Sequence, residues 1–427
     1  MNIGIIIGRI GGVDGVALET EKWIEVLTRM GHKIYIISGQ YECKKIDPEI
    51  EILVPEMSFF SPENIWEQKK AFFNPEGRLN GLLGNIDYHA DIIYNKILDW
   101  IKEKKIDLLI SENASALPSH LSMGVAIKKV VEKTGLPTIT HDHDFAWERG
   151  DRYQSPHEEV NKIIEDVFPL RSANVRNAVI NQHGKKTLDE RFNTNALVVP
   201  NVMDFDKPYA ELTEKNKCFR RDLGLSRDDI ILSQVTRIVK RKGIETAIQL
   251  VHDLADRNVK LVITGNHADD EGSKYYHELI DLIHDLNLMR QIYFASHNIS
   301  HNGFPNGNGR YYSLSDVYAN SNSCTYFSTY EGFGNAFVEA VLSRTPIFVN
   351  NYKPVYWPDI GSKGFKTVML EDNKLTDDSV KQMQDIIYSP KLNREIADYN
   401  FELGKKLFSY DTLQNKLEEL IEWVRSV

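Results

Sequence analysis

Two glutamates bracket a glycine-rich turn in the second half of the chain. Glu331 and Glu339 are separated by seven residues, which begin with Gly332-Phe333-Gly334-Asn335. The turn follows an apolar run that predicts a strand, and it opens a predicted helix whose first N–H groups can bind phosphates or sugar hydroxyls. A helix start that simply carries favourable acids is the alternative. We predict that Glu331 contacts a sugar, and that Glu339 reaches a ribose if the helix points along a nucleotide.

Four basic residues follow the first predicted strand of the same half. The run reads Thr-Arg-Ile-Val-Lys-Arg-Lys-Gly, and Arg237 and Lys242 are its candidate binding residues. Parallel sheets bind ligands beyond the carboxyl ends of their strands. Two cations held there could neutralise a diphosphate that gains charge as it leaves. A solvated basic turn is the alternative interpretation.

A second glycine-rich turn lies near the N-terminus. Gly11-Gly12-Val13-Asp14-Gly15 follows a predicted strand and opens a helix. Backbone N–H groups at a helix start favour anions, and glycine lets a ligand approach the backbone closely. The spacing is not that of the dinucleotide motif G-x-G-x-x-G, and a turn without function is the alternative. We predict that Gly12 and Gly15 help to bind the phosphorylated ligand.

Histidine and aspartate alternate at the end of another predicted strand, in Thr140-His141-Asp142-His143-Asp144. Such a group suggests a metal site. His141 and His143 share one face only if the strand continues through both of them. A plain strand-end loop is a further alternative. We expect no metal here.

An aromatic residue and two arginines come next, as Trp147, Arg149 and Arg152. Trp147 can stack on a sugar ring, and either arginine can bind a phosphate or carboxylate with two parallel hydrogen bonds. The alternative is a solvent-exposed helix start in which the arginines pair with Glu148 and Asp151. We predict that this segment binds a small, anionic acceptor.

Alternating strands and helices must position these residues. Apolar runs predict strands at 3–7, 33–38, 107–111, 137–141, 178–181, 196–199, 230–235, 259–264, 292–294, 324–327 and 346–349, and helical periodicity predicts helices at 16–30, 92–104, 124–134, 243–253, 273–286 and 410–427. This alternation is typical of doubly wound parallel sheets in an α/β protein. The pattern restarts after Pro200-Asn201-Val202-Met203-Asp204. We therefore predict domains at 1–200 and 201–405, and a terminal helix at 406–427 that packs back on the first domain.

Size and charge limit the function classes. A chain of 427 residues is too long for one hydrophobic core, and its net charge of −10 argues against non-specific nucleic-acid binding. Three widely spaced cysteines suggest neither disulfides nor a zinc site. We find no signal segment and no apolar run of the ~20 residues that a membrane span needs, so we expect a cytoplasmic protein. Homo-oligomerisation is left open. Residues 59–88 are irregular and are interpreted as an insertion or a lid.

Taken together, these motifs resemble the retaining family-four glycosyltransferases, which include sucrose-phosphate synthases and bacterial mannosyltransferases. The two glutamates with the upstream Arg and Lys match the family signature, and Gly-Gly-Val-Asp-Gly matches its first glycine-rich loop. Val202 departs from the family's interdomain Pro-Asn-Gly-Val-Asp. The resemblance covers nearly the whole chain and is most specific over 235–350. It implies the GT-B fold, with two Rossmann-like domains facing a central cleft.

The resemblance also implies roles for the residues. Arg237 and Lys242 would bind the donor diphosphate, Glu331 the transferred sugar and Glu339 the ribose. Gly12, Gly15 and the Gly332–Asn335 turn complete the expected donor site. A histidine that contacts the transferred sugar matches His141, with His143 as the alternative.

The expected activity is retaining transfer of a hexose from a UDP-, GDP- or ADP-linked donor, without a cofactor. Loops such as 297–300 are expected to read the base, and no role is assigned to the continuation of this loop to 310. The expected acceptor is small, soluble and anionic, for example a glycosylglycerate or a sugar phosphate. A glycosyl phosphorylase, a sugar-nucleotide epimerase and a non-catalytic sugar-binding protein are the alternatives. No lysine is identifiable as a pyridoxal-phosphate site, which disfavours the phosphorylase.

Overall fold

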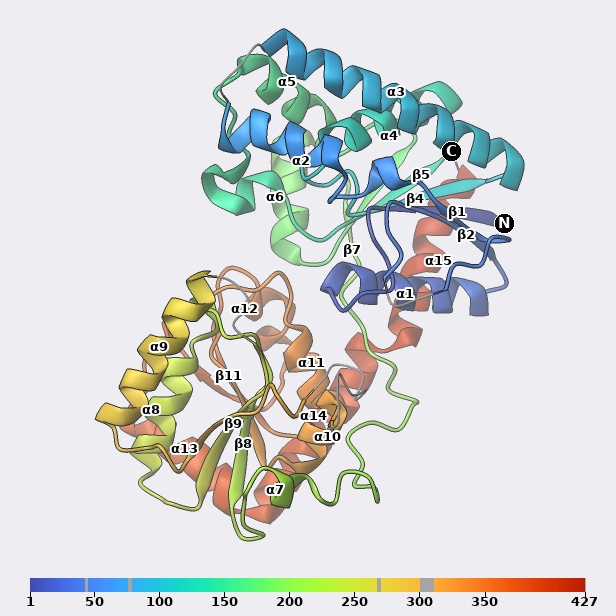
Figure 1. Ribbon diagram of the computed structural model, residues 1–427. Coiled ribbons are helices and arrows are strands. Elements are labelled where there is room, and N and C mark those ends of the chain that lie inside the picture. Colours follow the sequence, from blue (N-terminus) through green and yellow to red (C-terminus); the bar gives the residue numbers. More distant parts are fainter. Residues whose placement is uncertain (43–44, 76–78, 267–269, 300–310, 427) are drawn as a thin grey trace. The chain divides into compact units, whose positions relative to one another are not determined.

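The computed structural model describes residues 1–42, 45–75, 79–266, 270–299 and 311–426. The chain divides into two compact units (Figure 1). Unit 1 comprises Met1–Asn201 together with Tyr410–Val427, and unit 2 comprises Val202–Ser409. The last two helices meet at Ser409, so the segment that returns to unit 1 begins at 410 rather than at the predicted 406.

Unit 1 is built on a parallel sheet of strand order β3-β2-β1-β4-β5-β6-β7. The strands are β1 (Asn2–Ile7), β2 (Lys33–Ser38), β3 (Glu51–Leu53), β4 (Leu108–Glu112), β5 (Thr138–Asp142), β6 (Val175–Val179) and β7 (Leu197–Val198). Ile5 of β1 lies opposite Ile36 on one side and Ile110 on the other. The central strands are buried because helices cover both faces, and polar side chains lie toward their carboxyl ends, as in Ser111 and Glu112 of β4 and His141 and Asp142 of β5.

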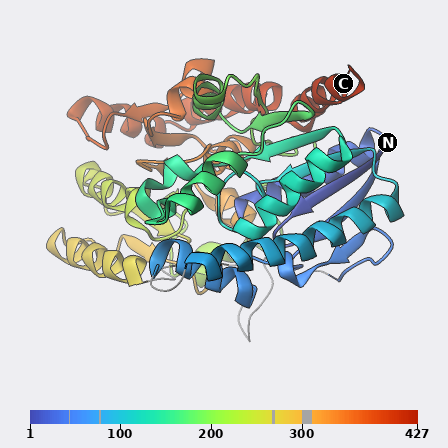
Figure 2. The ribbon, with the colours of Figure 1, turned by 90° about the horizontal axis from the view of Figure 1, so that it is seen from above.

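The helices of unit 1 form a layer on each side of this sheet (Figure 1). They are α1 (Gly15–Arg29), η1 (Pro55–Met57), α2 (Pro62–Gln68), η2 (Lys69–Phe73), α3 (Leu79–Lys104), α4 (Leu121–Thr134), η3 (Ala146–Tyr153), α5 (Glu158–Val167), α6 (Gln182–Phe192) and α15 (Tyr410–Ser426). The long helix α3 (Figure 2) packs Ile93 and Ile97 against Ile6 and Leu109 of the sheet. Helices α1 and α15 pack together on the opposite face.

Unit 2 contains a second parallel sheet, of order β10-β9-β8-β11-β12-β13. Its elements are α7 (Phe219–Asp222), β8 (Ile230–Gln234), η4 (Lys240–Lys242), α8 (Ile244–Leu254), β9 (Val259–Ile263), α9 (Asp270–Asp285), β10 (Ile292–Phe294), α10 (Leu314–Asn320), β11 (Ser323–Tyr326), α11 (Asn335–Leu342), β12 (Ile347–Asn350), α12 (Tyr356–Asp359), η5 (Gly361–Lys363), β13 (Val368–Leu370), α13 (Asp377–Tyr388) and α14 (Pro390–Phe408). Consecutive residues of β8 face opposite sides of the sheet. Ile231 belongs to the apolar cluster that contains Phe219, and Leu232 belongs to the cluster that contains Ile248.

The prediction of two doubly wound α/β units is confirmed. Strands β3 and β13 were not predicted, and α3 begins at Leu79 rather than at 92. The irregular segment 59–88 contains α2, η2 and the first turns of α3. No helix among the described residues is long and apolar enough to cross a membrane.

Each sheet has a point where the strand order reverses, between β1 and β4 in unit 1 and between β8 and β11 in unit 2. In open parallel sheets, ligands bind beyond the strand ends at such a point. The loops that follow these four strands are therefore the places to search for a site.

Candidate active site

In unit 2, the loops after β8 and β11 meet because of a glycine. Gly243 ends the short turn η4 with a φ of +59°, which favours glycine. A Cβ at this position would lie 2.2 Å from the carbonyl oxygen of Phe327. The glycine therefore lets the basic loop approach the end of β11 closely, and this approach brings Lys242 beside Glu331.

Glu331 is held by two cations in a nearly buried site. Its carboxylate contacts the ammonium of Lys242 and lies 3.1 Å from the guanidinium of Arg241. The side chains of Glu331 and Lys242 are only 11% and 10% exposed. Burial alone would raise the pKa of Glu331, but Lys242 and Arg241 together lower it below its usual value. Glu331 is therefore ionised at neutral pH.

Arg237 lies near the same pair but is exposed. The pKa of Lys242 is lowered, mainly by burial, and the charges of Arg241 and Arg237 add to the shift against the opposing effect of Glu331. Within the described part of the chain, no carboxylate forms an ion pair with Arg237. The structure thus gathers the predicted Arg237, Lys242 and Glu331 at one strand-order reversal.

Arg241 is a site residue that the sequence analysis did not single out. It donates to the carbonyl oxygen of Tyr330 at 2.8 Å as well as to Glu331. It stands in the basic run already noted, so its type was visible in the sequence. The backbone of η4 and Gly243 determines which cations of that run turn toward Glu331.

The glycine-rich turn leads into α11 as predicted, and Phe333 lies within that turn. Gly334 is the N-cap of α11 with a φ of +131°, and a Cβ there would lie 2.2 Å from the Tyr352 hydroxyl oxygen. That hydroxyl donates to the carbonyl oxygen of Phe333 at 2.9 Å. The ring of Phe333 is buried and packs edge-on against Phe408 at 5.6 Å between ring centroids. The ring of Phe333 is therefore part of the core, and the assignment of Phe333 to the donor site stays a prediction. Gly332 and Asn335 remain partly exposed beside Gly334.

Glu339 lies within α11 and is partly exposed. It accepts a hydrogen bond from the hydroxyl of Tyr318 at 3.3 Å. Burial, followed by the charge of Glu339, raises the pKa of Tyr318 well above its usual value, so the tyrosine stays a neutral donor. Glu339 is thereby fixed on the helix that begins at the glycine-rich turn.

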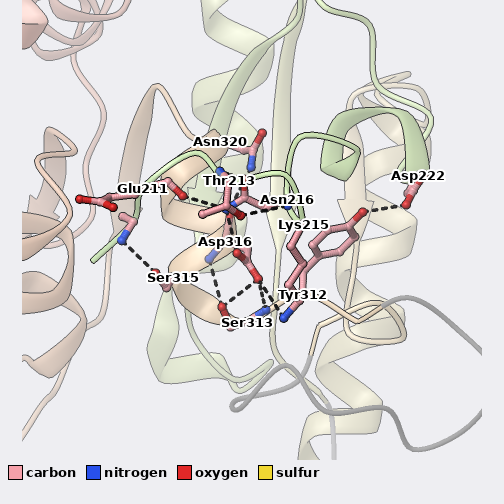
Figure 3. Close-up of polar contacts among 11 residues, drawn as sticks. Glu211, Thr213, Lys215, Asn216, Asp222, Tyr312, Ser313, Ser315, Asp316 and Asn320 are labelled. Atoms are coloured by element: carbon pink, nitrogen blue, oxygen red, sulfur yellow. Dashed lines mark hydrogen bonds and ion pairs between the residues drawn. The ribbon is translucent and has the colours of Figure 1, made fainter. Parts of the chain in front are cut away.

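Residue 300 of the expected base-reading loop 297–300 lies outside the described residues, as does the continuation of the loop to 310. A polar network holds the chain that follows it (Figure 3). Buried Asn216 donates to Asp316 at 2.8 Å, and Asp316 caps α10 together with Ser313. The hydroxyl of Tyr312 donates to Asp222 at 2.7 Å. These hydrogen bonds fix the start of α10, which follows the loop.

In unit 1, the N-terminal glycine-rich turn is occupied by its own carboxylates. Asp14 caps α1, accepting from the N–H groups of its first turn at 3.2 Å. Arg9 lies 3.2 Å from Asp14 and 3.7 Å from Glu42. A Cβ at Gly12 would lie 2.1 Å from a carboxylate oxygen of Glu42. That oxygen is the end of a flexible side chain that can move aside, so the donor-site roles of Gly12 and of Gly15, the exposed first residue of α1, stay predictions.

His141 is fully buried at the end of β5. Its Nδ1 lies 2.8 Å from Glu112, and its ring stacks on Trp23 at 4.0 Å between centroids. His143 follows just beyond the strand and retains some exposure, and its N–H donates to Asn113 at 3.0 Å. Burial lowers the pKa of His143 well below its usual value, so its imidazole is neutral at pH 7. Of the two histidines, His143 alone retains some exposed surface, although its Nε2 is buried like that of His141.

Glu112, His141 and His143 also form a compact cluster. One potential ligand atom from each lies within 4.8 Å of the others. Glu112 Oε1 and the Nε2 atoms of both histidines are buried without a hydrogen-bond partner. Such a donor set fits a divalent transition metal. The sequence-based expectation of no metal therefore stays a prediction.

A cavity of about 800 Å³ opens at the strand-order reversal of unit 1. Residues that follow β1, β4 and β5 line it, together with the segment from Phe59 to Asn74. Arg149 and Arg152 both line this cavity, and Arg149 pairs with Asp144. The predicted acceptor segment thus reaches a real cavity.

Trp147 does not share the cavity with those arginines. It stacks on Phe145 at 4.7 Å between centroids and lies under Arg191 at 4.4 Å. It lines a separate cavity of about 490 Å³ in the same unit. The two linings therefore do not support the hypothesis that Trp147 shares one binding site with Arg149 and Arg152.

Comparison with known proteins shows the family of the chain. Residues 216–402 match the family described as "Glycosyl transferases group 1". Mannosylglucosylglycerate synthase of Petrotoga mobilis is 31% identical over 392 residues, covering 87% of this chain and 86% of that protein. Mannosylglucosylglycerate synthase of Thermotoga maritima is 29% identical over 445 residues, covering 98% and 99%.

The fold has solved counterparts. The crystal structure of Anabaena HepE in complex with UDP-glucose superposes with a TM-score of 0.63 at 14% identity, and each chain is covered completely. At that identity the likeness concerns the fold. The chain therefore belongs to the group 1, family-four glycosyltransferases, and its two units are the Rossmann-like domains of the GT-B fold.

Proposed function

We propose that this glycosyltransferase moves a hexose from a nucleotide-sugar donor to a small anionic acceptor with retention of anomeric configuration. The observation that carries the proposal is the nearly buried Glu331, held by Lys242 and Arg241 beside exposed Arg237. Three cations around one carboxylate leave positive charge for a diphosphate. The helix start of α11 adds free backbone N–H groups.

The donor side would work by charge stabilisation. As the sugar–phosphate bond breaks, negative charge builds on the leaving diphosphate. Lys242, Arg241 and Arg237 are held in place before the reaction, so they stabilise that charge without reorganising. Glu331 is ionised and can accept hydrogen bonds from sugar hydroxyls. The UDP-glucose bound to HepE is the kind of donor that this fold holds in a protein of similar architecture.

Glu339 is the proposed ribose ligand, since it lies on the helix that begins at the diphosphate end of the site. In unit 1 we assign the sugar contact to His143 rather than to His141. His141 is fully enclosed by Trp23 and Glu112, whereas His143 retains exposure beyond the strand end.

The acceptor is assigned to the cavity of unit 1. Four cations line it: Arg9, Lys69, Arg149 and Arg152. The name of the two matched synthases describes a product that contains glycerate, which is a carboxylate. A sugar acid is therefore the acceptor class that we propose.

Two measurements test the function. Thermal shift with UDP-, GDP- and ADP-linked glucose and mannose should identify one donor, since a ligand at a hundredfold its Kd stabilises by roughly 2.7 kcal/mol. NMR of the product formed with that donor and glucosylglycerate should show the donor's anomeric configuration retained. An inverted product would refute retention. A released epimer, or phosphate-dependent cleavage without transfer, would favour the epimerase or phosphorylase alternative.

A further inference from the structure

The cations of the unit 1 cavity differ in whether they already have a partner. Arg9 is paired with Asp14 and Glu42, and Arg149 with Asp144. Lys69 and Arg152 line the same cavity, and no carboxylate among the described residues forms an ion pair with either. Their two charges are the ones available to a ligand.

Two of the three acids that line the cavity hold arginines: Asp14 pairs with Arg9, and Asp144 with Arg149. The third, Glu112, lies 2.8 Å from His141, and its Oε1 is buried without a hydrogen-bond partner. The four cations of the lining therefore outnumber its three acids, and the two cations without a carboxylate partner among the described residues are Lys69 and Arg152.

These two residues come from different segments that meet at the cavity. Lys69 begins η2, whereas Arg152 lies near the end of η3. The guanidinium carbon of Arg152 lies 5.9 Å from the ring centroid of Phe73, at the end of η2, and 5.5 Å from that of Tyr153. Both rings line the cavity. The arginine is therefore placed over the same short helical turn that carries Lys69.

The segment that carries Lys69 is tied down on both sides of the lysine. Gln68 donates to the carbonyl oxygen of Pro118 at 2.9 Å, and Ser155 donates to that of Ala71 at 2.7 Å. Asn64 donates to the carbonyl oxygen of Ser119 at 3.0 Å. A backbone fixed at these points holds Lys69 at the cavity wall before a ligand arrives, which reduces the ordering cost of binding.

We infer that Lys69 and Arg152 form the subsite for the acceptor's anionic group, a carboxylate or a phosphate. The inference rests on the proposed acceptor site and names the residues that select its charge. A lysine supplies a compact point charge, and an arginine supplies two parallel N–H donors. The exposed rings of Phe60 and Phe73 line the same cavity and suit the apolar faces of a sugar.

The test compares acceptors that differ in charge. Glucosylglycerate carries a carboxylate, glucose 6-phosphate a phosphate, and glucosylglycerol neither. In Lys69→Ala and in Arg152→Ala, the KM for the charged acceptors should rise about tenfold or more, because each variant loses a charge-assisted hydrogen bond. Glucosylglycerol has no anionic group to lose such a bond, and the donor is assigned to unit 2. The KM for each of them should therefore stay within about twofold of wild type. The charged acceptor whose KM rises more in these variants identifies the preferred anionic group as a carboxylate or a phosphate.

The chain offers a matched control. Lys70→Ala changes the neighbouring lysine, which lies outside the cavity lining. This variant should discriminate between charged and neutral acceptors like wild type. The inference is overturned if Lys69→Ala and Arg152→Ala leave the charged-to-neutral KM ratio unchanged, or if Lys70→Ala changes it equally.

Calorimetric titration with D-glycerate separates this inference from the proposed function. Binding that is present in wild type and lost in Lys69→Ala and Arg152→Ala supports the subsite, even if no acceptor is turned over. Binding that is equal in wild type and both variants refutes it. A failure of transfer with every donor refutes the function alone.

Discussion

Replacing Lys242 by methionine tests the donor site most directly. The change keeps the length of the side chain but removes its charge from a pair that is about one-tenth exposed on each side. Losing one preorganised charge contact costs on the order of 3 kcal/mol in the barrier, which is roughly a 150-fold loss of kcat. Glu331 keeps Arg241 at 3.1 Å, so it is not left as an unpaired buried charge. We therefore expect a loss of folding stability of about 2 kcal/mol, below the 3–5 kcal/mol of a fully orphaned partner.

The assay is the initial rate of sugar transfer at saturating donor, measured alongside thermal unfolding. Lys240→Met is the matched control, since Lys240 lies on the same turn, is exposed and lies 3.7 Å from Glu278 at the surface. It should stay within about 0.5 kcal/mol of wild type in stability and keep its activity. Near-normal kcat in a folded Lys242→Met enzyme would refute the proposed role of this pair.

Three further predictions concern unit 1. Burial raises the pKa of Glu67 to about 7 from its usual 4.5. The protonated carboxyl therefore stabilises the fold fully below pH 4.5. This contribution to the free energy of unfolding, on the order of 3 kcal/mol, is lost as pH rises through 7. The melting temperature of Glu67→Gln relative to wild type should therefore rise between pH 5 and pH 8, and a constant difference would contradict this. Trp147→Ala should lower stability by about 2 kcal/mol while leaving acceptor KM unchanged, because the ring stacks away from the cavity; a raised KM would return it to the acceptor site. Activity should survive a chelator, and loss that Mn²⁺ or Zn²⁺ restores would instead assign a metal to Glu112, His141 and His143.

The sequence predicts most of the central strands because buried parallel strands contain short runs of apolar residues, such as 5–7 in β1 and 108–110 in β4. Strands β3 and β13 have three residues each, which is too short for a periodic signal. Helix α3 was predicted to start late because Gly81 and Gly84 weaken its first turns, and a Cβ at either position would meet nothing within 4 Å. Packing of the helix against the sheet overrides that local preference.

The candidate site, like the fold, could be predicted from the sequence only in part. The types of Glu331, Lys242 and Arg237 and their place after strands were enough to predict a shared location. The choice of Arg241 depends on one positive-φ glycine, which no spacing rule identifies. Lys69 lies in a segment that reads as irregular, and its role becomes visible only when the partners of every cavity cation are known. Charge compensation across loops far apart in sequence is not encoded in local pattern.

The chain order of the two units has a consequence for biosynthesis. Unit 2 is one continuous segment inserted into unit 1, whose final helix α15 buries Leu413, Leu417, Leu420, Ile421 and Val424. During translation unit 2 can leave the ribosome complete, whereas unit 1 lacks this helix until α15 itself has been made and has left the ribosome. The domain made first is thus the last able to finish folding, and its uncovered apolar face must stay out of aggregation while the rest of the chain is made.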